Sequence, residues 1–179
     1  MKLLALACLA SACWTNPAPR VEHRTAQPPD RFSIKLERTA CHGRCPVYAV
    51  TIDDDGGVTY RGEWNVVALG EQHGRADGKK LAEVIAAVER LRFFELDHFG
   101  RIPKGTTVRR DGKYKIYDFE EDVICSGMST AIVTVTRRGA TKKISNSHCT
   151  ELPIVELEDL IDEAAGSKQW VGPGGLIDL

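Results

Sequence analysis

The sequence predicts an α+β domain with a mainly antiparallel sheet: three or four strands, a helix, a hairpin and a second helix. Alternating apolar and polar residues over 32–38 and 47–52 indicate strands with one buried face. Two later segments, one after Asp77 and one after Thr150, repeat apolar residues at helical spacing. Because strands come first in each half of the chain and a helix follows, we expect the helices to pack on one face of the sheet.

The first strands are arranged around a short cysteine loop at 41–45. The strand over 47–52 follows this loop and leads into a turn at 53–57, where three aspartates precede two glycines. The segment 58–62 returns from the turn as the second arm of a hairpin. A further strand is expected over 64–69.

The middle of the chain contains a helix and a long loop. Asp77 is expected to cap the helix, because its carboxylate can accept hydrogen bonds from free backbone N–H groups. Residues 100–124 are expected to form a long loop, within which the alternating segment 114–119 could form an edge strand. The segments 131–136 and 140–147 form the final hairpin. The apolar stripe of the helix consists of Leu81, Val84, Ile85, Val88 and Leu91.

A second helix is expected after the final hairpin, beginning at Thr150 or Glu151. Gly166 is placed to end this helix, since glycine readily adopts the left-handed conformation of a helix C-terminus. Trp170 is expected to fold back onto the core. The apolar stripe of this helix consists of Ile154, Leu157, Leu160, Ile161 and Ala164.

The N-terminus has the pattern of an export signal. Lys2 supplies a positive charge, and residues 3–10 form an apolar run that is too short to span a bilayer, which needs roughly 20 residues. Residues 9–13 resemble the lipobox of bacterial lipoproteins, whose cysteine is lipidated and becomes the mature N-terminus. We therefore expect an exported protein of the cell envelope that faces the periplasm or exterior, with a lipid on Cys13. The alternative is ordinary secretion with cleavage near Ala12.

The chain is expected to contain one globular domain. Residues 1–12 form the signal peptide, and residues 13–31 form a Pro-rich tether that cannot bury enough apolar surface to become ordered. The α+β domain spans 32–172, and a loose tail follows at 173–179. A lipidated cysteine followed by such a tether is typical of a domain held away from a membrane.

Four cysteines lie within the expected domain, at Cys41, Cys45, Cys125 and Cys149. An even number of cysteines in an exported chain favours disulfides. Cys41 and Cys45 can bridge if their loop turns back, whereas Cys125 and Cys149 flank a hairpin whose antiparallel pairing brings its ends together. We predict the bonds Cys41–Cys45 and Cys125–Cys149, with the crossed pairings as the alternative.

The same cysteines, with His42 and His148 beside two of them, would also suit a zinc site or a thiol-dependent activity. However, the chain has no second pair with metal-ligand spacing, and a nucleophilic cysteine needs an unpaired thiolate. The sequence contains no phosphate-binding loop, nucleophile elbow or His-Glu-x-x-His motif. We therefore predict a protein that is not an enzyme and that carries no cofactor or metal.

The charge of the chain bears on its partners. The formal net charge is −1, and no basic block is interleaved with aromatic residues, so no nucleic-acid partner is expected. The expected partner is the membrane, contacted through the N-terminal lipid, with an unidentified protein as a possible second partner.

The cysteine loop and its neighbours resemble a bacterial family of extracytoplasmic, lipoprotein-type domains of unknown function. The resemblance covers roughly residues 33–171 and implies export and this fold, but it implies no activity. Members often carry Thr-Asp where this chain has Cys125-Ser126, so a role for that aspartate does not transfer. The matching positions are Glu37-Arg38-Thr39, Cys41, Gly43, Cys45-Pro46, Tyr48, Asp55-Gly56, Gly62, Phe93-Phe94, Leu157-Glu158, Ile161-Asp162 and Trp170.

Three hypotheses for the function follow from the sequence. The leading one is a membrane-anchored lipoprotein whose small disulfide-stabilised domain has a binding or structural role. The second is a zinc-dependent or thiol-dependent activity at the four domain cysteines. The third is an inhibitor or sensor module that uses the 100–124 loop.

Overall fold

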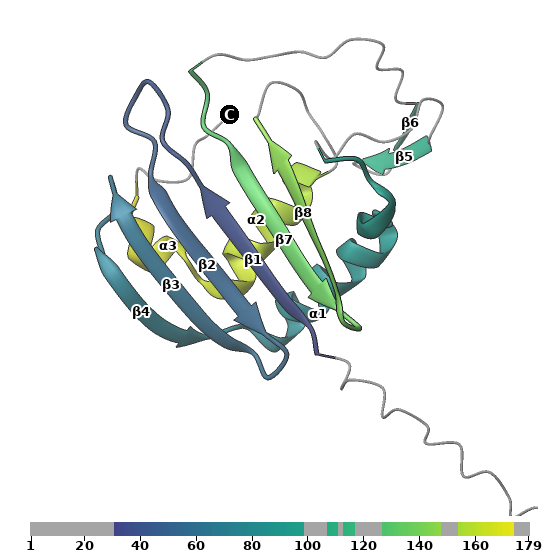
Figure 1. Cartoon of the computed structure of the whole chain (residues 1–179), viewed down its shortest axis with the longest axis horizontal. Coiled ribbons are helices and arrows are strands. Elements are labelled where there is room, and N and C mark those ends of the chain that lie inside the picture. The colour runs from purple at the N-terminus through teal and green to yellow at the C-terminus, as the bar shows by residue number, and fades with distance from the viewer. Residues whose placement is uncertain (1–30, 99–106, 111–112, 117–126, 148–153, 174–179) are drawn as a thin grey trace, which may run out of the picture.

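A six-stranded antiparallel sheet with the order β4-β3-β2-β1-β7-β8 forms the centre of the computed structural model (Figure 1). The structure describes residues 31–98, 107–110, 113–116, 127–147 and 154–173. The strands of the sheet are β1 (Ser33–Arg38), β2 (Val47–Asp53), β3 (Gly57–Trp64), β4 (Gly70–Arg75), β7 (Ala131–Arg137) and β8 (Ala140–Asn146). The helices are α1 (Gly78–Arg90), the 3-10 helix η1 (Phe93–Glu95), α2 (Ile154–Ala165) and α3 (Lys168–Val171).

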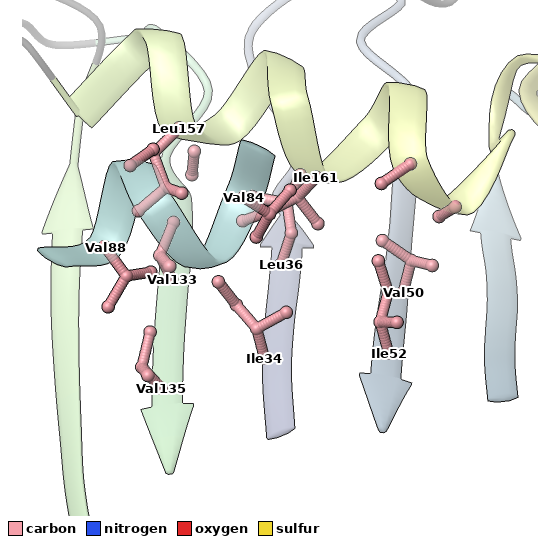
Figure 2. Close-up of a cluster of buried hydrophobic side chains, with 14 of the residues drawn as sticks. Ile34, Leu36, Val50, Ile52, Val84, Val88, Val133, Val135, Leu157 and Ile161 are labelled. Carbon is pink, nitrogen blue, oxygen red and sulfur yellow. The ribbon is translucent and has the colours of Figure 1, made fainter. Parts of the chain in front are cut away.

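The core lies between the sheet and the two long helices, which cover the same face of the sheet (Figure 2). The central strand β1 pairs with β2 on one side and with β7 on the other, so that Leu36 stands opposite Val50 and Val133. These side chains are fully buried, and Val84 of α1 and Ile161 of α2 are buried with them. Alternation along β1, β2 and β7 therefore places every second residue in the core, as the sequence predicts.

The ends of the helices follow local rules of helix capping. The Asp77 side chain accepts a hydrogen bond of 2.9 Å from the backbone N–H of Lys80, which confirms it as the N-cap of α1. Gly166 follows α2 with a φ of 65°, in the left-handed region that an L-residue adopts only at a cost in free energy. The antiparallel sheet and the two long helices together confirm the predicted α+β class with a mainly antiparallel sheet.

The prediction of a strand over 64–69 is wrong. Strand β3 extends to Trp64, a turn follows, and the next strand is β4, which begins at Gly70. The turn folds closely over β3, because a side chain at Gly62 would lie 2.0 Å from the carbonyl oxygen of Ala68. The sequence did not reveal β4 because this edge strand is mostly exposed and lacks apolar alternation.

The strand count is also higher than predicted. Beside the six-stranded sheet, β5 (Thr107–Arg110) and β6 (Lys113–Ile116) form a separate two-stranded sheet. The edge strand considered for 114–119 therefore corresponds to β6, but β6 pairs with β5 instead of extending the main sheet. The rest of the 100–124 loop lies outside the described residues, as do the predicted signal peptide, Cys13 and most of the predicted tether.

Candidate functional site

The cysteine loop between β1 and β2 is closed by a disulfide. Cys41 and Cys45 are bonded, and their Cα atoms are 5.7 Å apart. Backbone hydrogen bonds fix the loop against the segment that precedes β7: Thr39 donates to Thr130 over 2.9 Å, and His42 donates to Gly127 over 3.0 Å. The disulfide and these hydrogen bonds therefore fix the corner that the loop forms between β1 and β2.

A buried ion network lies under this corner, on the helix-covered side of the sheet. Arg38, the last residue of β1, donates from Nη2 to Oδ2 of Asp162 on α2 over 2.9 Å and from Nε over 3.1 Å. Tyr48 lies opposite Arg38 on β2, and its hydroxyl donates to the same carboxylate over 2.9 Å. The guanidinium Nε also donates to the Tyr48 hydroxyl over 3.1 Å. Three segments that are distant in sequence therefore meet at one carboxylate.

Glu158 extends the network by one helical turn of α2. Its Oε2 lies 3.6 Å from Nη1 of Arg38, and its Oε1 accepts a hydrogen bond of 2.9 Å from Asn146 at the end of β8. Beyond the C-terminal end of α2, the hydroxyl of Ser167 donates to Oδ1 of Asp162. The network thus joins β1, β2, β8, α2 and the segment after α2, and it consists of Arg38, Tyr48, Asn146, Glu158, Asp162 and Ser167.

Burial and charge shift the acid–base properties of these groups. Burial of Glu158 raises its pKa to about 7, although the hydrogen bond from Asn146 and the charge of Arg38 oppose the shift. Burial and the Asp162 carboxylate also raise the pKa of Tyr48. Burial alone would lower the pKa of Arg38, but Asp162, Tyr48 and Glu158 together raise it. The guanidinium therefore stays charged, and Glu158 is the group that changes protonation near neutral pH.

A stack of aromatic rings continues from the network toward the β4 edge of the sheet. The rings of Tyr48 and Tyr60 are stacked with centroids 5.5 Å apart, and Tyr60 and Trp170 are stacked with centroids 5.0 Å apart. This contact confirms that Trp170 folds back onto the core. Burial and Asp162 raise the pKa of Tyr60 to about 12, and among the described residues its hydroxyl has no hydrogen-bond partner.

The network is enclosed. The Glu158 side chain is fully buried, and Tyr48 and Asp162 retain only 2% and 5% of their exposure. A carboxylic acid with a raised pKa is a common feature of active sites. Here, Arg38 and Tyr48 donate to Asp162 and Asn146 donates to Glu158, so the network connects elements of the fold.

The structure tests only some of the predicted site residues. It confirms the Cys41–Cys45 bond, whereas Cys13, Cys125, Cys149 and His148 lie outside the described residues. The bond occupies two of the sulfur atoms that the zinc hypothesis requires. Within the ranges that the structure describes, no group of three or more His, Cys, Asp or Glu side chains is arranged to hold a metal ion. None of the helices described is long and apolar enough to cross a membrane.

Sequence reasoning assigned no role to the residues of the ion network, although several of them lie among the matching positions quoted for the family resemblance. One signal was available. Glu158 and Asp162 directly follow Leu157 and Ile161 of the apolar stripe, so one turn of helix brings both acids toward the buried face. A carboxylate beside an apolar stripe needs a buried cation or donor, and Arg38 at the end of β1 supplies that cation.

Comparison with protein families matches residues 32–165 to the domain of unknown function DUF6438. The chain belongs to this family. No curated protein and no solved structure matches it. In this DUF6438 chain, the matched residues include all of the ion network except Ser167, together with the disulfide loop.

Proposed function

We propose that this chain is an exported lipoprotein, anchored through Cys13, whose DUF6438 domain binds a partner and does not catalyse a reaction. The observation that carries the proposal is the Cys41–Cys45 disulfide, because such bonds persist in oxidising compartments outside the cytoplasm. The lipobox-like sequence before Cys13 supports the anchor. The enclosure of the ion network supports the non-catalytic part of the proposal, since Arg38, Tyr48 and Asp162 are paired with one another and buried.

The surface near the disulfide also supports a binding role. At the end of β3 and in the turn that follows it, the apolar side chains of Trp64, Val67 and Leu69 are 55%, 72% and 65% exposed. The side chain of Asn65 in the same turn donates to the carbonyl oxygen of Cys45 over 3.2 Å, so the turn is attached to the disulfide loop. Exposed large apolar residues that lie close together mark interaction surfaces more often than catalytic ones.

Mass spectrometry of the mature protein from a bacterial host tests the anchor. We expect an N-terminal Cys13 that carries lipid, and we expect a Cys13→Ala variant to leave the membrane fraction. A mature chain that begins beyond Cys13 without lipid would contradict this part of the proposal and favour ordinary secretion.

Thiol counting on the native, unreduced protein tests the oxidising compartment. We expect Cys41 and Cys45 to resist alkylation until a reductant is added. If both react at once and zinc is released with them, the metal-dependent hypothesis would replace ours. The inhibitor or sensor role of the 100–124 loop stays a prediction, because the structure describes only β5 and β6 of that segment.

A further inference from the structure

A cavity of about 500 Å³ lies on the side of the domain away from the β3–β4 turn, where the C-terminal end of α1, helix η1 and the β7–β8 turn meet. Its apolar lining comes from Val88, Phe93, Phe94 and Ala140. The size falls within the range of small-molecule sites in proteins. Phe93 is buried, whereas Phe94 is 37% exposed, so an apolar ring faces the opening.

Helix η1, which carries the two phenylalanines, is fixed in place. The ammonium group of Lys142 on β8 donates to the carbonyl oxygen of Phe94 over 3.0 Å and also to that of Leu96. The Phe93 and Phe94 rings pack edge to face with centroids 6.0 Å apart. The apolar wall of the cavity is therefore held by both strand and helix contacts, as a site formed before ligand binding requires.

Three arginines, Arg92, Arg137 and Arg138, line the same cavity. Two of them occupy backbone positions that favour glycine. Arg92 directly follows the C-cap of α1 with a φ of 50°, and Arg138 forms the tight β7–β8 turn with a φ of 52°. An L-residue in this left-handed region loses stability relative to glycine. The chain thus accepts unfavourable backbone geometry at two of the arginines that line this cavity.

Two glutamates also line the cavity, and both already pair with arginines. Glu89 accepts from Nη1 of Arg137 over 2.7 Å, and Glu95 accepts from Nε of Arg92 over 2.9 Å. These glutamate side chains are 60% and 61% exposed, so water screens the pairs and they hold the arginines weakly. Because a guanidinium has five N–H donors, Arg92 and Arg137 can each donate to a further anion without losing their glutamates. Among the described residues, the lining contains three arginines and two glutamates.

We propose that this cavity binds a small amphiphile with a single carboxylate. The carboxylate contacts the arginines of the rim, and the apolar body packs against Phe94 and Val88. This inference goes beyond the proposed function, whose binding surface lies beside the disulfide. Two classes of ligand share this chemistry: aromatic acids, and aliphatic acids that derive from lipids. Calorimetry with one acid of each class distinguishes them.

Binding to the complete chain can be measured by calorimetry with octanoate and with phenylbutanoate. The corresponding neutral amides serve as matched probes of the same shape. We expect at least one carboxylate to bind and its amide to bind about tenfold more weakly, the loss that follows when a charge-assisted hydrogen bond is removed. The acid that binds more tightly identifies the aliphatic or the aromatic source.

The variants Arg92→Gly and Arg138→Gly separate the site from the fold. Each should weaken carboxylate binding about tenfold while leaving the melting temperature unchanged or raising it by roughly 2–5 °C, because glycine fits the left-handed backbone. Arg90→Ala is the control, since Arg90 lies on α1 outside the cavity and pairs with Glu156. Its binding should equal that of the unaltered chain.

Three results would overturn the inference: no carboxylate binding at millimolar concentration, equal binding of acid and amide, or full binding by both glycine variants. None of them bears on the anchor. An unlipidated chain that still binds the carboxylate would contradict the anchor alone, whereas a lipidated chain that binds neither acid would contradict the cavity alone.

Discussion

The guanidinium of Arg38 lies 2.9 Å from the carboxylate of Asp162, although 124 residues separate the two in the sequence. The contact joins the end of the central strand β1 to the last part of α2. Because Tyr48 and Ser167 donate to the same carboxylate, Asp162 links α2 to both β1 and β2.

Replacing Asp162 with Asn should strongly destabilise the domain. The substitution removes the anion and leaves the Arg38 charge buried without its main partner, a change that typically costs about 3–5 kcal/mol. Urea denaturation monitored by tryptophan fluorescence would measure the loss. Asp159→Asn is the matched control, because Asp159 lies 3.9 Å from Arg38 and is 65% exposed, so its loss should change the unfolding free energy by less than about 1 kcal/mol. Equal effects of the two variants would contradict the central role of Asp162.

Loss of the hydroxyl group should lower the unfolding free energy at Tyr48 but not at Tyr60, although the two rings are stacked. Tyr48→Phe removes a buried donor from Asp162 and should lower the unfolding free energy by about 1–3 kcal/mol. Tyr60→Phe removes a buried hydroxyl that has no hydrogen-bond partner among the described residues, so stability should stay constant or increase. The same urea titration compares them. A large loss in Tyr60→Phe would show that its hydroxyl has a partner.

Glu158 should make the stability of the domain dependent on pH. Burial raises its pKa from 4.5 to about 7, so the folded state binds this proton more tightly than the unfolded state does. The resulting stabilisation is fully present below pH about 4.5 and is lost as the pH rises through about 7, a decrease of about 3 kcal/mol.

The glutamine of the Glu158→Gln variant does not titrate, so the variant should lose the pH dependence of stability that Glu158 causes. The difference in unfolding free energy between Glu158→Gln and the unaltered chain should therefore shift in favour of the variant between pH about 4 and about 8. A difference that stays constant with pH would mean that Glu158 has an ordinary pKa in the folded protein.

Loss of the disulfide should weaken the domain without unfolding it. Closing so short a loop contributes about 2 kcal/mol to stability in the chain-entropy model. This is less than the cost expected above for Asp162→Asn. The Cys41→Ser/Cys45→Ser double variant should lose about this amount in urea titrations under oxidising conditions. Adding dithiothreitol should destabilise the unaltered chain more than the double variant, which keeps only the predicted Cys125–Cys149 bond. If the double variant cannot fold, the disulfide contributes more to stability than about 2 kcal/mol.

Local patterns predicted the parts of the fold that depend on neighbouring residues. The Asp77 cap, the apolar stripes and the alternating strands β1, β2 and β7 each have a signal within one element. Strand β4 has no such signal, because its side chains are mostly exposed and its position depends on the turn that crosses Gly62. The ion network could not be assembled from the sequence, since its geometry depends on how α2 lies across the sheet.

The Tyr60–Trp170 contact has a consequence for where the folded unit ends. The family match stops at residue 165, but Trp170 covers Tyr60, and the carbonyl oxygens of Trp170 and Val171 accept hydrogen bonds from Ala68 and Val67. A fragment cut at the family boundary would lack Ser167, uncover an aromatic face and leave two turn amides without these acceptors. The region of sequence similarity is thus shorter than the unit that must fold together.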